Sequence, residues 1–220
     1  MSEQKKYEFT GKIKTIFGIE FKQIRAIISF GCVVAGEIGG WIECEENLSQ
    51  SGDAWVSGDA WVSGDARVYG DARVSGDAWV SGDAEVSGDA RVYGDALVSG
   101  NARVSGDARV SGNARVSGDA RVSGNARVSG NARVSGDAEV SGDAEVKKDD
   151  DYMVVGGAGR YNRFTTFFKC RDKTIKVICG CFFGTIIEFR AKVKETHKGN
   201  KHEKVYLAMA DMVELQLDDK

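Results

Sequence analysis

The sequence predicts a mainly β protein: a left-handed parallel β-helix, that is, a triangular β-solenoid with 18 residues per coil. Residues 51–146 are sixteen consecutive hexapeptides of the form (Ser/Tyr)-Gly-(Asp/Asn)-Ala-x-Val, without an insertion or deletion. The Ala-x-Val alternation is typical of a short strand with two residues inward and one outward. The Gly-Asp or Gly-Asn pair favours a corner, because these residues accept left-handed backbone angles. Hexapeptide repeats of this kind indicate a parallel β-helix.

The regular aliphatic positions argue against a disordered low-complexity tract, although Gly, Ser and Asp are abundant. Three hexapeptides close one coil, so sixteen units predict about five coils. At about 4.8 Å per stacked strand the rod is roughly 25 Å long. Its core is only Ala and Val, so backbone ladders between coils must supply much of the stability.

Residues 1–50 are not repetitive and are predicted to form an N-terminal β cap. Residues 7–17 and 19–28 alternate well enough for a β-hairpin across Gly18, and residues 39–42 lead into the solenoid. An open solenoid end exposes unpaired strand edges. A cap is therefore physically required.

Residues 152–220, which follow a charged segment at 147–151, are predicted to be a small C-terminal α+β domain, too large to be only a cap. Thr185 and Glu188 form the pattern of a capping box and predict a helix start. Strands are expected at 152–155, 164–169 and 174–179, and a second helix at 202–217. The inward residues expected on the two helices are Ile186, Ile187, Phe189, Val193, Val205, Tyr206, Met209, Met212 and Val213.

The lead-in and the repeat together resemble the YdcK-type β-solenoid proteins, which occur in bacteria and are common among phage and prophage proteins. The resemblance covers residues 20–146. It is carried by Ile24-Arg25-Ala26-Ile27, Gly39-Gly40-Trp41-Ile42-Glu43 and Glu46-Asn47-Leu48-Ser49 before the Gly-Asp-Ala-Trp-Val repeats. It implies a left-handed β-helix with an N-terminal cap, and little about activity. Residues 162–167 and 180–182 also resemble a domain attached to phage solenoids.

The outward fifth positions stack in three columns, because residues 18 apart share a face. Exposed aromatic side chains beside arginines are typical of a protein-binding surface. Alternatively, a terminal segment folds over the tryptophans, or copies of the chain self-associate there. The candidate partner-binding residues are Trp55, Trp61, Trp79, Leu97, Arg73, Arg91, Arg115 and Arg133.

The corners form a second array, in which Asn replaces Asp at Asn101, Asn113, Asn125 and Asn131. We interpret these residues as solvated turn residues whose amides relieve repulsion between stacked carboxylates. A strip that mimics nucleic acid, or a calcium-binding edge, is the alternative. The Gly-Gly-x-Gly-x-Asp pattern of calcium-binding β-rolls is absent from the sequence.

The sequence predicts a protein that is not an enzyme, with no catalytic residue, cofactor or metal. Hexapeptide-repeat acyltransferases share the repeat, but they need a catalytic histidine near a cleft. Here the repeats contain no histidine, and His197 and His202 fall in a polar connection. Cys179 and Cys181 could join these histidines around zinc, but strand alternation favours buried, inert thiols on one face.

The C-terminal domain keeps nucleic-acid binding open as an alternative. Residues 156–204 hold twelve Lys or Arg against four acidic residues, whereas the whole chain has a net charge of −3. Aromatic and cationic strands can stack bases. The residues concerned are Arg160, Arg163, Lys169, Arg171, Lys173 and Lys176 around Phe164, Phe167 and Phe168.

We expect a cytoplasmic location and no membrane. Five cysteines at irregular spacing indicate reduced thiols, no apolar stretch approaches about 20 residues, and the first residues do not form a signal peptide. The expected function is a non-catalytic protein-binding or assembly scaffold for a phage or prophage. A further hypothesis is that it blocks a host defence protein.

Overall fold

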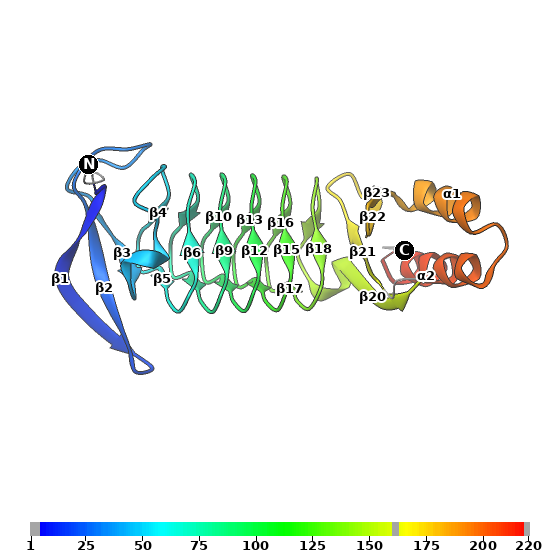
Figure 1. Cartoon of the computed structure of the whole chain (residues 1–220), viewed down its shortest axis with the longest axis horizontal. Coiled ribbons are helices and arrows are strands. Elements are labelled where there is room, and N and C mark those ends of the chain that lie inside the picture. Colours follow the sequence, from blue (N-terminus) through cyan, green and yellow to red (C-terminus); the bar gives the residue numbers. More distant parts are fainter. Residues whose placement is uncertain (1–4, 160–162, 218–220) are drawn as a thin grey trace.

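A straight rod forms the middle of the molecule, with a β-hairpin at one end and a small sheet with two helices at the other (Figure 1). The structure is a computed structural model that describes residues 5–159 and 163–217. Sixteen two-residue strands make up the rod and stack into three parallel sheets, here called faces 1, 2 and 3. The parallel β-solenoid predicted from the repeat is confirmed, and the strands of each face lie 18 residues apart.

The strands of face 1 are β4 (Trp55–Val56), β7 (Arg73–Val74), β10 (Arg91–Val92), β13 (Arg109–Val110), β16 (Arg127–Val128) and β19 (Glu145–Val146). Those of face 2 are β5 (Trp61–Val62), β8 (Trp79–Val80), β11 (Leu97–Val98), β14 (Arg115–Val116) and β17 (Arg133–Val134). Those of face 3 are β6 (Arg67–Val68), β9 (Glu85–Val86), β12 (Arg103–Val104), β15 (Arg121–Val122) and β18 (Glu139–Val140).

The rod's interior is made of the repeated Ala and Val side chains, all of which have an exposed fraction of 0%. Each coil donates to the next through bonds such as Arg91 N–H to the Ala108 carbonyl oxygen, at 2.9 Å. Corner glycines have positive φ and stack closely: a Cβ added to Gly100 (φ +67°) would lie 3.0 Å from the Gly118 nitrogen. Both the conformation and the spacing therefore select glycine at these corners.

The rod begins before the first hexapeptide, with one coil that the repeat pattern does not reveal. In β3 (Ile38–Ile42), Trp41 pairs in parallel with Trp61, and Leu48 bridges Val68. The buried Asn47 amide closes the corner: its Oδ1 accepts from the Cys44 N–H at 3.0 Å, and its Nδ2 donates to the Ala66 carbonyl at 2.9 Å. Asn47 is the last residue of the 3₁₀ turn η1 (Glu45–Asn47).

The predicted N-terminal hairpin is present as β1 (Tyr7–Ile16) and β2 (Ile19–Ala26). Phe17 and Gly18 form its turn, both with positive φ. Strand β2 pairs antiparallel with β3, so the hairpin extends the sheet of face 2 beyond the rod.

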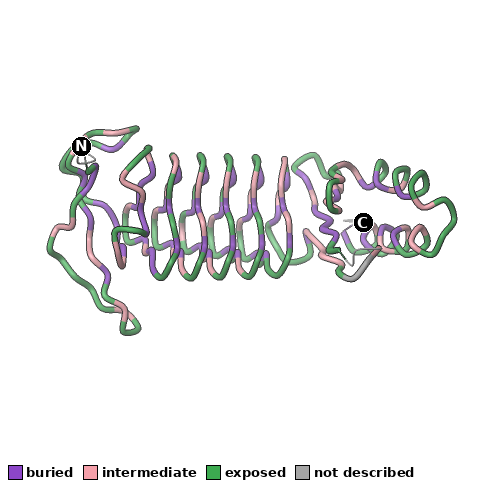
Figure 2. Tube along the Cα trace, viewed as in Figure 1, coloured by how far each residue is buried: buried purple, intermediate pink, exposed green. Residues whose placement is uncertain are grey.

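At the other end a four-stranded antiparallel sheet lies across the last coil and carries two helices on its outer side (Figure 1). Phe168 packs into the rod's core and its neighbour Phe167 packs against the helices, and both are fully buried. Buried segments recur in every coil of the rod and continue into the C-terminal sheet (Figure 2). The elements are η2 (Asp149–Asp151), β20 (Tyr152–Ala158), β21 (Arg163–Lys169), β22 (Ile175–Cys179), β23 (Phe182–Thr185), α1 (Ile186–His197) and α2 (Lys201–Leu217). Strand β23 was not predicted, because its four residues contain a Gly and carry little periodicity.

The predicted capping box is confirmed: the Glu188 N–H donates to Thr185 Oγ1 at 3.2 Å, and the Thr185 N–H donates to Glu188 Oε2 at 2.7 Å. The inward faces of the helices were partly mispredicted. Ile187 is 75% exposed, and Val205 and Met212 are also exposed. The reason is that α1 and α2 bury only one side each against the sheet and each other. No helix among the described residues is long and apolar enough to cross a membrane.

Candidate functional site: an arginine edge on the rod

The N-terminal segment covers the predicted tryptophan cluster. Trp55 is only 3% exposed, because Phe30 packs edge-on against its ring at 5.5 Å and Tyr7 at 6.5 Å. The prediction of Trp55 as an exposed anchor is therefore corrected: its indole belongs to the cap's core. The N-terminal segment folds over this ring, as the alternative prediction stated.

The hairpin also lies against the tryptophans of face 2. Phe21 is fully buried and packs edge-on against Trp61 at 4.8 Å and against Trp79 at 6.1 Å. Trp41 stacks on Trp61 at 5.4 Å, and Phe17 stacks on Trp79 at 6.0 Å. Trp61 and Trp79 are thus half-buried. Trp41 starts this column, a position that sequence reasoning missed because the first coil does not follow the hexapeptide.

A buried lysine closes the rod's first strand edge. Lys6 is 2% exposed, and its ammonium group donates to the carbonyl oxygens of Ala54 at 2.8 Å and Gly52 at 3.1 Å. Burial lowers the pKa of Lys6 to about 8, and the nearby Asp53 and Asp71 carboxylates partly oppose the shift. These contacts satisfy the edge carbonyls and give the cap a structural role.

The other predicted partner-binding residues lie along the rod and differ in accessibility. Arg73 is half-buried and contacts the Cys32 thiol of the cap, and Leu97 is half-buried next to Trp79 on face 2. Arg91, Arg115 and Arg133 are exposed. The structure therefore separates the predicted set into tryptophans beneath the cap and open arginines further along.

Four arginines border one corner of the late coils, between faces 1 and 2. We call this set, Arg109 and Arg127 on face 1 with Arg115 and Arg133 on face 2, the arginine edge. Arg109 stacks on Arg127, and Arg115 stacks on Arg133. Three are exposed; Arg127 is half-buried, and its buried Nε has no hydrogen-bond partner among the described residues.

The corner within the arginine edge is neutral. It holds Asn113 and Asn131, and the Asn113 Nδ2 donates to the Asn131 Oδ1 at 3.3 Å. In the earlier coils the same corner holds Asp59, Asp77 and Asp95. At this corner the carboxylates of the early coils are thus replaced by amides in the late coils, whereas the neighbouring corners keep Asp107 beside Arg109 and Asp119 beside Arg115.

Face 3 provides the contrast. Its Arg121 lies 3.4 Å from the Glu139 carboxylate, and its Arg103 lies 3.7 Å from Glu85. In the part of the chain that the structure describes, no arginine of the arginine edge forms an ion pair. Among the described residues, the ion-paired arginines of the rod thus lie on face 3. Two carboxylates approach the arginine edge without an ion pair: Glu145 is the strand neighbour of Arg127, and Asp149 Oδ1 accepts the Arg133 backbone N–H at 2.7 Å.

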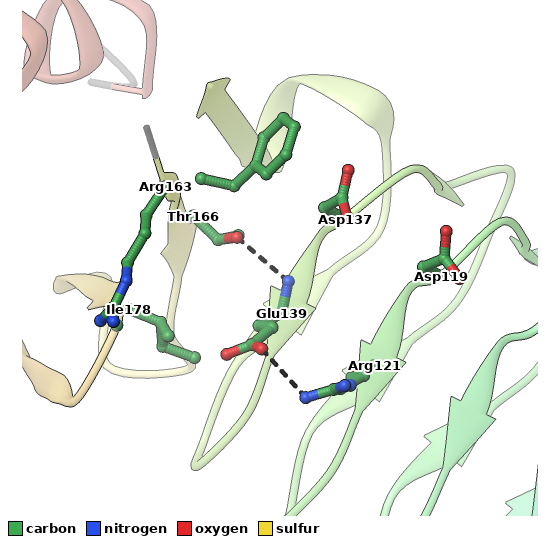
Figure 3. Close-up of a pocket in the computed structure, with 9 residues that line it drawn as sticks. Asp119, Arg121, Asp137, Glu139, Arg163, Thr166 and Ile178 are labelled. Carbon is green, nitrogen blue, oxygen red and sulfur yellow. Dashed lines mark hydrogen bonds and ion pairs between the residues drawn. The ribbon is translucent and has the colours of Figure 1, made fainter. Parts of the chain in front are cut away.

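A cavity of about 390 Å³ lies between face 3 and the C-terminal sheet, where Arg163, Thr166 and Ile178 face the last coils (Figure 3). The Glu139 N–H donates to Thr166 Oγ1 at 3.0 Å, which ties the sheet to the rod. Three carboxylates (Asp119, Asp137, Glu139) and two guanidinium groups (Arg121, Arg163) line it. This mixed lining leaves an excess of only one carboxylate, which is little charge to select a ligand.

The two histidines lie together, with ring centroids 5.8 Å apart, but the cysteines do not join them in a metal-binding group among the described residues. Cys179 is half-buried and accepts from the Thr165 hydroxyl at 3.2 Å, whereas Cys181 is exposed. The two thiols therefore do not share a buried face, because the strand ends at Cys179. His197 stacks on Tyr206 at 5.4 Å. Among the described residues no group of three His, Cys, Asp or Glu is placed to hold a metal.

The predicted base-stacking surface is also altered. Phe167 and Phe168 are fully buried on opposite faces of β21, so neither ring is open to a base. Phe164 remains 48% exposed. Arg160 lies outside the described residues.

Sequence reasoning missed Arg109 and Arg127 as members of a site. The available signal was the coincidence of Asn113 and Asn131 with arginines on both sides, which becomes visible only when the columns and corners are read together.

Seven segments within residues 66–142 match the model of the YdcK β-solenoid repeat. The comparison with curated proteins gave no match.

Proposed function

We propose that this chain, whose rod is built of YdcK β-solenoid repeats, is a non-catalytic scaffold that binds an acidic protein surface through the arginine edge. The observation that carries the proposal is a group of four arginines around a neutral Asn corner, none of which forms an ion pair with a described residue. Arginine is favoured at interfaces because its planar group binds carboxylates in a bidentate manner. The stacked coils hold these side chains at a fixed spacing, which reduces the entropy lost on binding.

The rod's charge distribution supports an oriented partner. The first eight hexapeptides, residues 51–98, carry nine acidic residues and three arginines, whereas residues 99–146 carry six of each. An acidic partner is repelled from the early coils and attracted to the late ones. The arginine edge therefore supplies both contact and orientation.

The same distribution favours a protein over nucleic acid. A long polyanion on the edge would extend over the acidic early coils, and the whole chain has a net charge of −3. Phe167 and Phe168 are buried, which removes two of the rings that could stack bases. Nucleic-acid binding is the outcome that salt-dependent retention on a polyanion column would reveal.

The test is a pull-down from nuclease-treated bacterial lysate with three baits: the parent, Arg115→Glu/Arg133→Glu, and the control Arg103→Glu/Arg121→Glu. The control reverses as many charges, but on face 3, where both arginines have carboxylate partners. We expect a protein that the parent and control retain and the edge variant loses. Equal retention by all three baits would refute the arginine edge as the binding surface.

The resemblance to phage and prophage solenoid proteins supports a finer proposal, that the chain is phage-encoded and blocks a host protein such as a defence component. Its test is expression in a bacterial host challenged with phage. The parent should raise phage infection of a host that carries the targeted defence, and the edge variant should not.

A second proposal, assembly, is favoured by helix α2. Its outward side presents Val205, Ala208, Met212 and Leu215, a 3-4-3 spacing in which Leu215 is 85% exposed. Its opposite side is buried by Tyr206, Ala210, Val213 and Leu217. A helix with apolar residues on both sides is usually covered on both. The spacing is that of a coiled-coil seam. Two copies of α2 can therefore pair antiparallel, with Val205 of one copy against Leu215 of the other and Ala208 against Met212.

We therefore expect a dimer through α2 in solution, measured by light scattering after size exclusion. Met212→Glu/Leu215→Glu should give a monomer. The control Ile187→Glu, which changes an exposed apolar residue of α1, should leave the dimer intact. A monomeric parent at about 100 µM would contradict the assembly proposal.

A further inference from the structure

A second cavity lies where the rod's last coil meets the C-terminal sheet and the end of α2. Its volume is about 680 Å³, within the range of small-molecule sites. We call it the lysine cleft. The cationic residues that line it are Lys147, Lys148, Lys169, Arg171 and Lys173.

Three of these cations already have carboxylate partners. Lys147 lies 2.9 Å from Glu145, and Lys169 lies 3.5 Å from Asp151 in a buried pair. Arg171 lies 2.7 Å from the Asp143 carboxylate outside the cleft. In each of these pairs the carboxylate neutralises the charge of the cation.

Lys148 and Lys173 form no ion pair with any described residue, and both are exposed. The Asp151 carboxylate that lines the cleft is engaged by other groups: its Oδ2 accepts the backbone N–H groups of Lys147 at 2.8 Å and Lys148 at 3.0 Å, and its Oδ1 lies 3.5 Å from Lys169. Among the described residues, the lining thus keeps two lysines without an ion-pair partner. Their combined charge exceeds the partial negative charge, about half an elementary charge, at the C-terminal end of α2.

The remaining wall is apolar. Ile175 and Leu217 line the cleft, and the adjoining Cys170 is a buried thiol whose pKa is raised by burial, so it adds no negative charge. A ligand that fits carries about two negative charges at one end and an apolar part at the other. A phosphate monoester has a charge of about −1.5 to −2 at neutral pH.

We propose that the lysine cleft binds an organic phosphate, whose phosphate group contacts Lys148 and Lys173 and whose organic part lies against Ile175 and Leu217. This site is separate from the arginine edge and does not depend on a protein partner. Lysine binds phosphate as a compact point charge, so the two ammonium groups need no bidentate geometry.

The test is isothermal titration of the full chain with three probes: adenosine monophosphate, inorganic phosphate and adenosine. We expect adenosine monophosphate to bind about tenfold more tightly than phosphate, binding to weaken with salt, and adenosine not to bind. Lys148→Glu/Lys173→Glu should lower the affinity for adenosine monophosphate at least about tenfold, and Lys148→Gln/Lys173→Gln should lower it less.

The matched control is Lys198→Glu/Lys204→Glu, which reverses two exposed lysines at the α1–α2 turn and on α2; its affinity should equal that of the parent. Circular dichroism checks that every variant is folded. The proposal is overturned if the parent binds neither phosphate compound at about 10 mM, or if the Glu variant of the cleft binds as well as the parent. If Lys148→Glu/Lys173→Glu loses the phosphate compound but still captures a protein from lysate, the lysine cleft and the arginine edge are independent sites.

Discussion

At the scale of single residues, Lys6 does the most to close the rod's first edge. Lys6→Met removes the donor to three carbonyl oxygens, of Ser51, Gly52 and Ala54. We expect a loss of about 2 kcal/mol in the free energy of unfolding at pH 7, because buried acceptors are left unsatisfied. Denaturant unfolding followed by tryptophan fluorescence measures it.

The pKa of Lys6 adds a pH dependence of defined sign. The folded pKa is about 8 and the ordinary value is 10.5, so between these values the unfolded chain binds more protons than the folded one. Lys6 therefore makes stability rise with pH through this window, by at most about 1.4 kcal/mol per pH unit. Below pH 8 it adds no slope.

The measurement is the stability difference between the parent and Lys6→Met from pH 7 to about pH 9.5, before ordinary tyrosines titrate. The difference should grow above pH 8. Lys12→Met, which changes an exposed lysine of the hairpin, should show no such growth. A stability difference between the parent and Lys6→Met that stays constant or shrinks above pH 8 would contradict the lowered pKa of Lys6.

Two corner glycines separate backbone strain from coil spacing. A Cβ added to Gly100 (φ +67°) would lie 3.0 Å from the Gly118 nitrogen, whereas a Cβ added to Gly136 (φ +65°) would meet no atom within 4 Å. Both Gly→Ala changes should cost the left-handed penalty of about 1–2 kcal/mol. Gly100→Ala should cost more, because the next coil must shift. Equal melting temperatures for the two variants would show that spacing contributes nothing.

Single residues were also the least predictable from sequence. The repeat places Ala and Val inward without ambiguity, because each recurs at one position of every unit. Burial of Trp55 and Lys6 depends on contacts with residues 25 to 48 positions away in the sequence, which no local pattern encodes. Ile187 was mispredicted because a helical period shows which residues are apolar, not how much of the helix is covered.

At the scale of elements, the hairpin stabilises the rod through Phe21. Phe21→Ala should cost about 3–5 kcal/mol, because a fully buried ring that packs on Trp61 and Trp79 is lost. Phe17→Ala is the matched control: Phe17 also stacks on Trp79 but is 88% exposed, so it should cost less than about 1 kcal/mol. A red-shifted tryptophan emission in the first variant alone would accompany these values, and equal costs would contradict the covering role of Phe21.

Elements with strong local signals were predicted well. The hairpin, the capping box and the coil strands each follow from residue types at fixed spacing. The first coil and β23 were not predicted, because the first coil departs from the 18-residue spacing and β23 is short. The C-terminal sheet was read as part of a separate domain, yet Phe168 on β21 joins the rod's core. Packing across that boundary is a tertiary property that the sequence does not display.

At the scale of the whole molecule, charge is distributed along a rigid axis. The early coils are acidic and the cap packs over their tryptophans. The late coils present the arginine edge, and the C-terminal end presents the lysine cleft and α2. The columns could be predicted from the repeat. Their charge state could not, because it depends on which arginines find carboxylates, as Arg121 does with Glu139.

The most direct test of the scaffold is site-specific photo-crosslinking in bacterial lysate. Benzoylphenylalanine is placed at Arg115 or Arg133 on the arginine edge, or at Arg103 or Arg121 on face 3, and adducts are identified by mass spectrometry. We expect one and the same protein to be crosslinked from Arg115 and Arg133, and none from the face 3 positions. Adducts of equal yield from both faces, or from neither, would contradict a scaffold that binds its partner through the arginine edge.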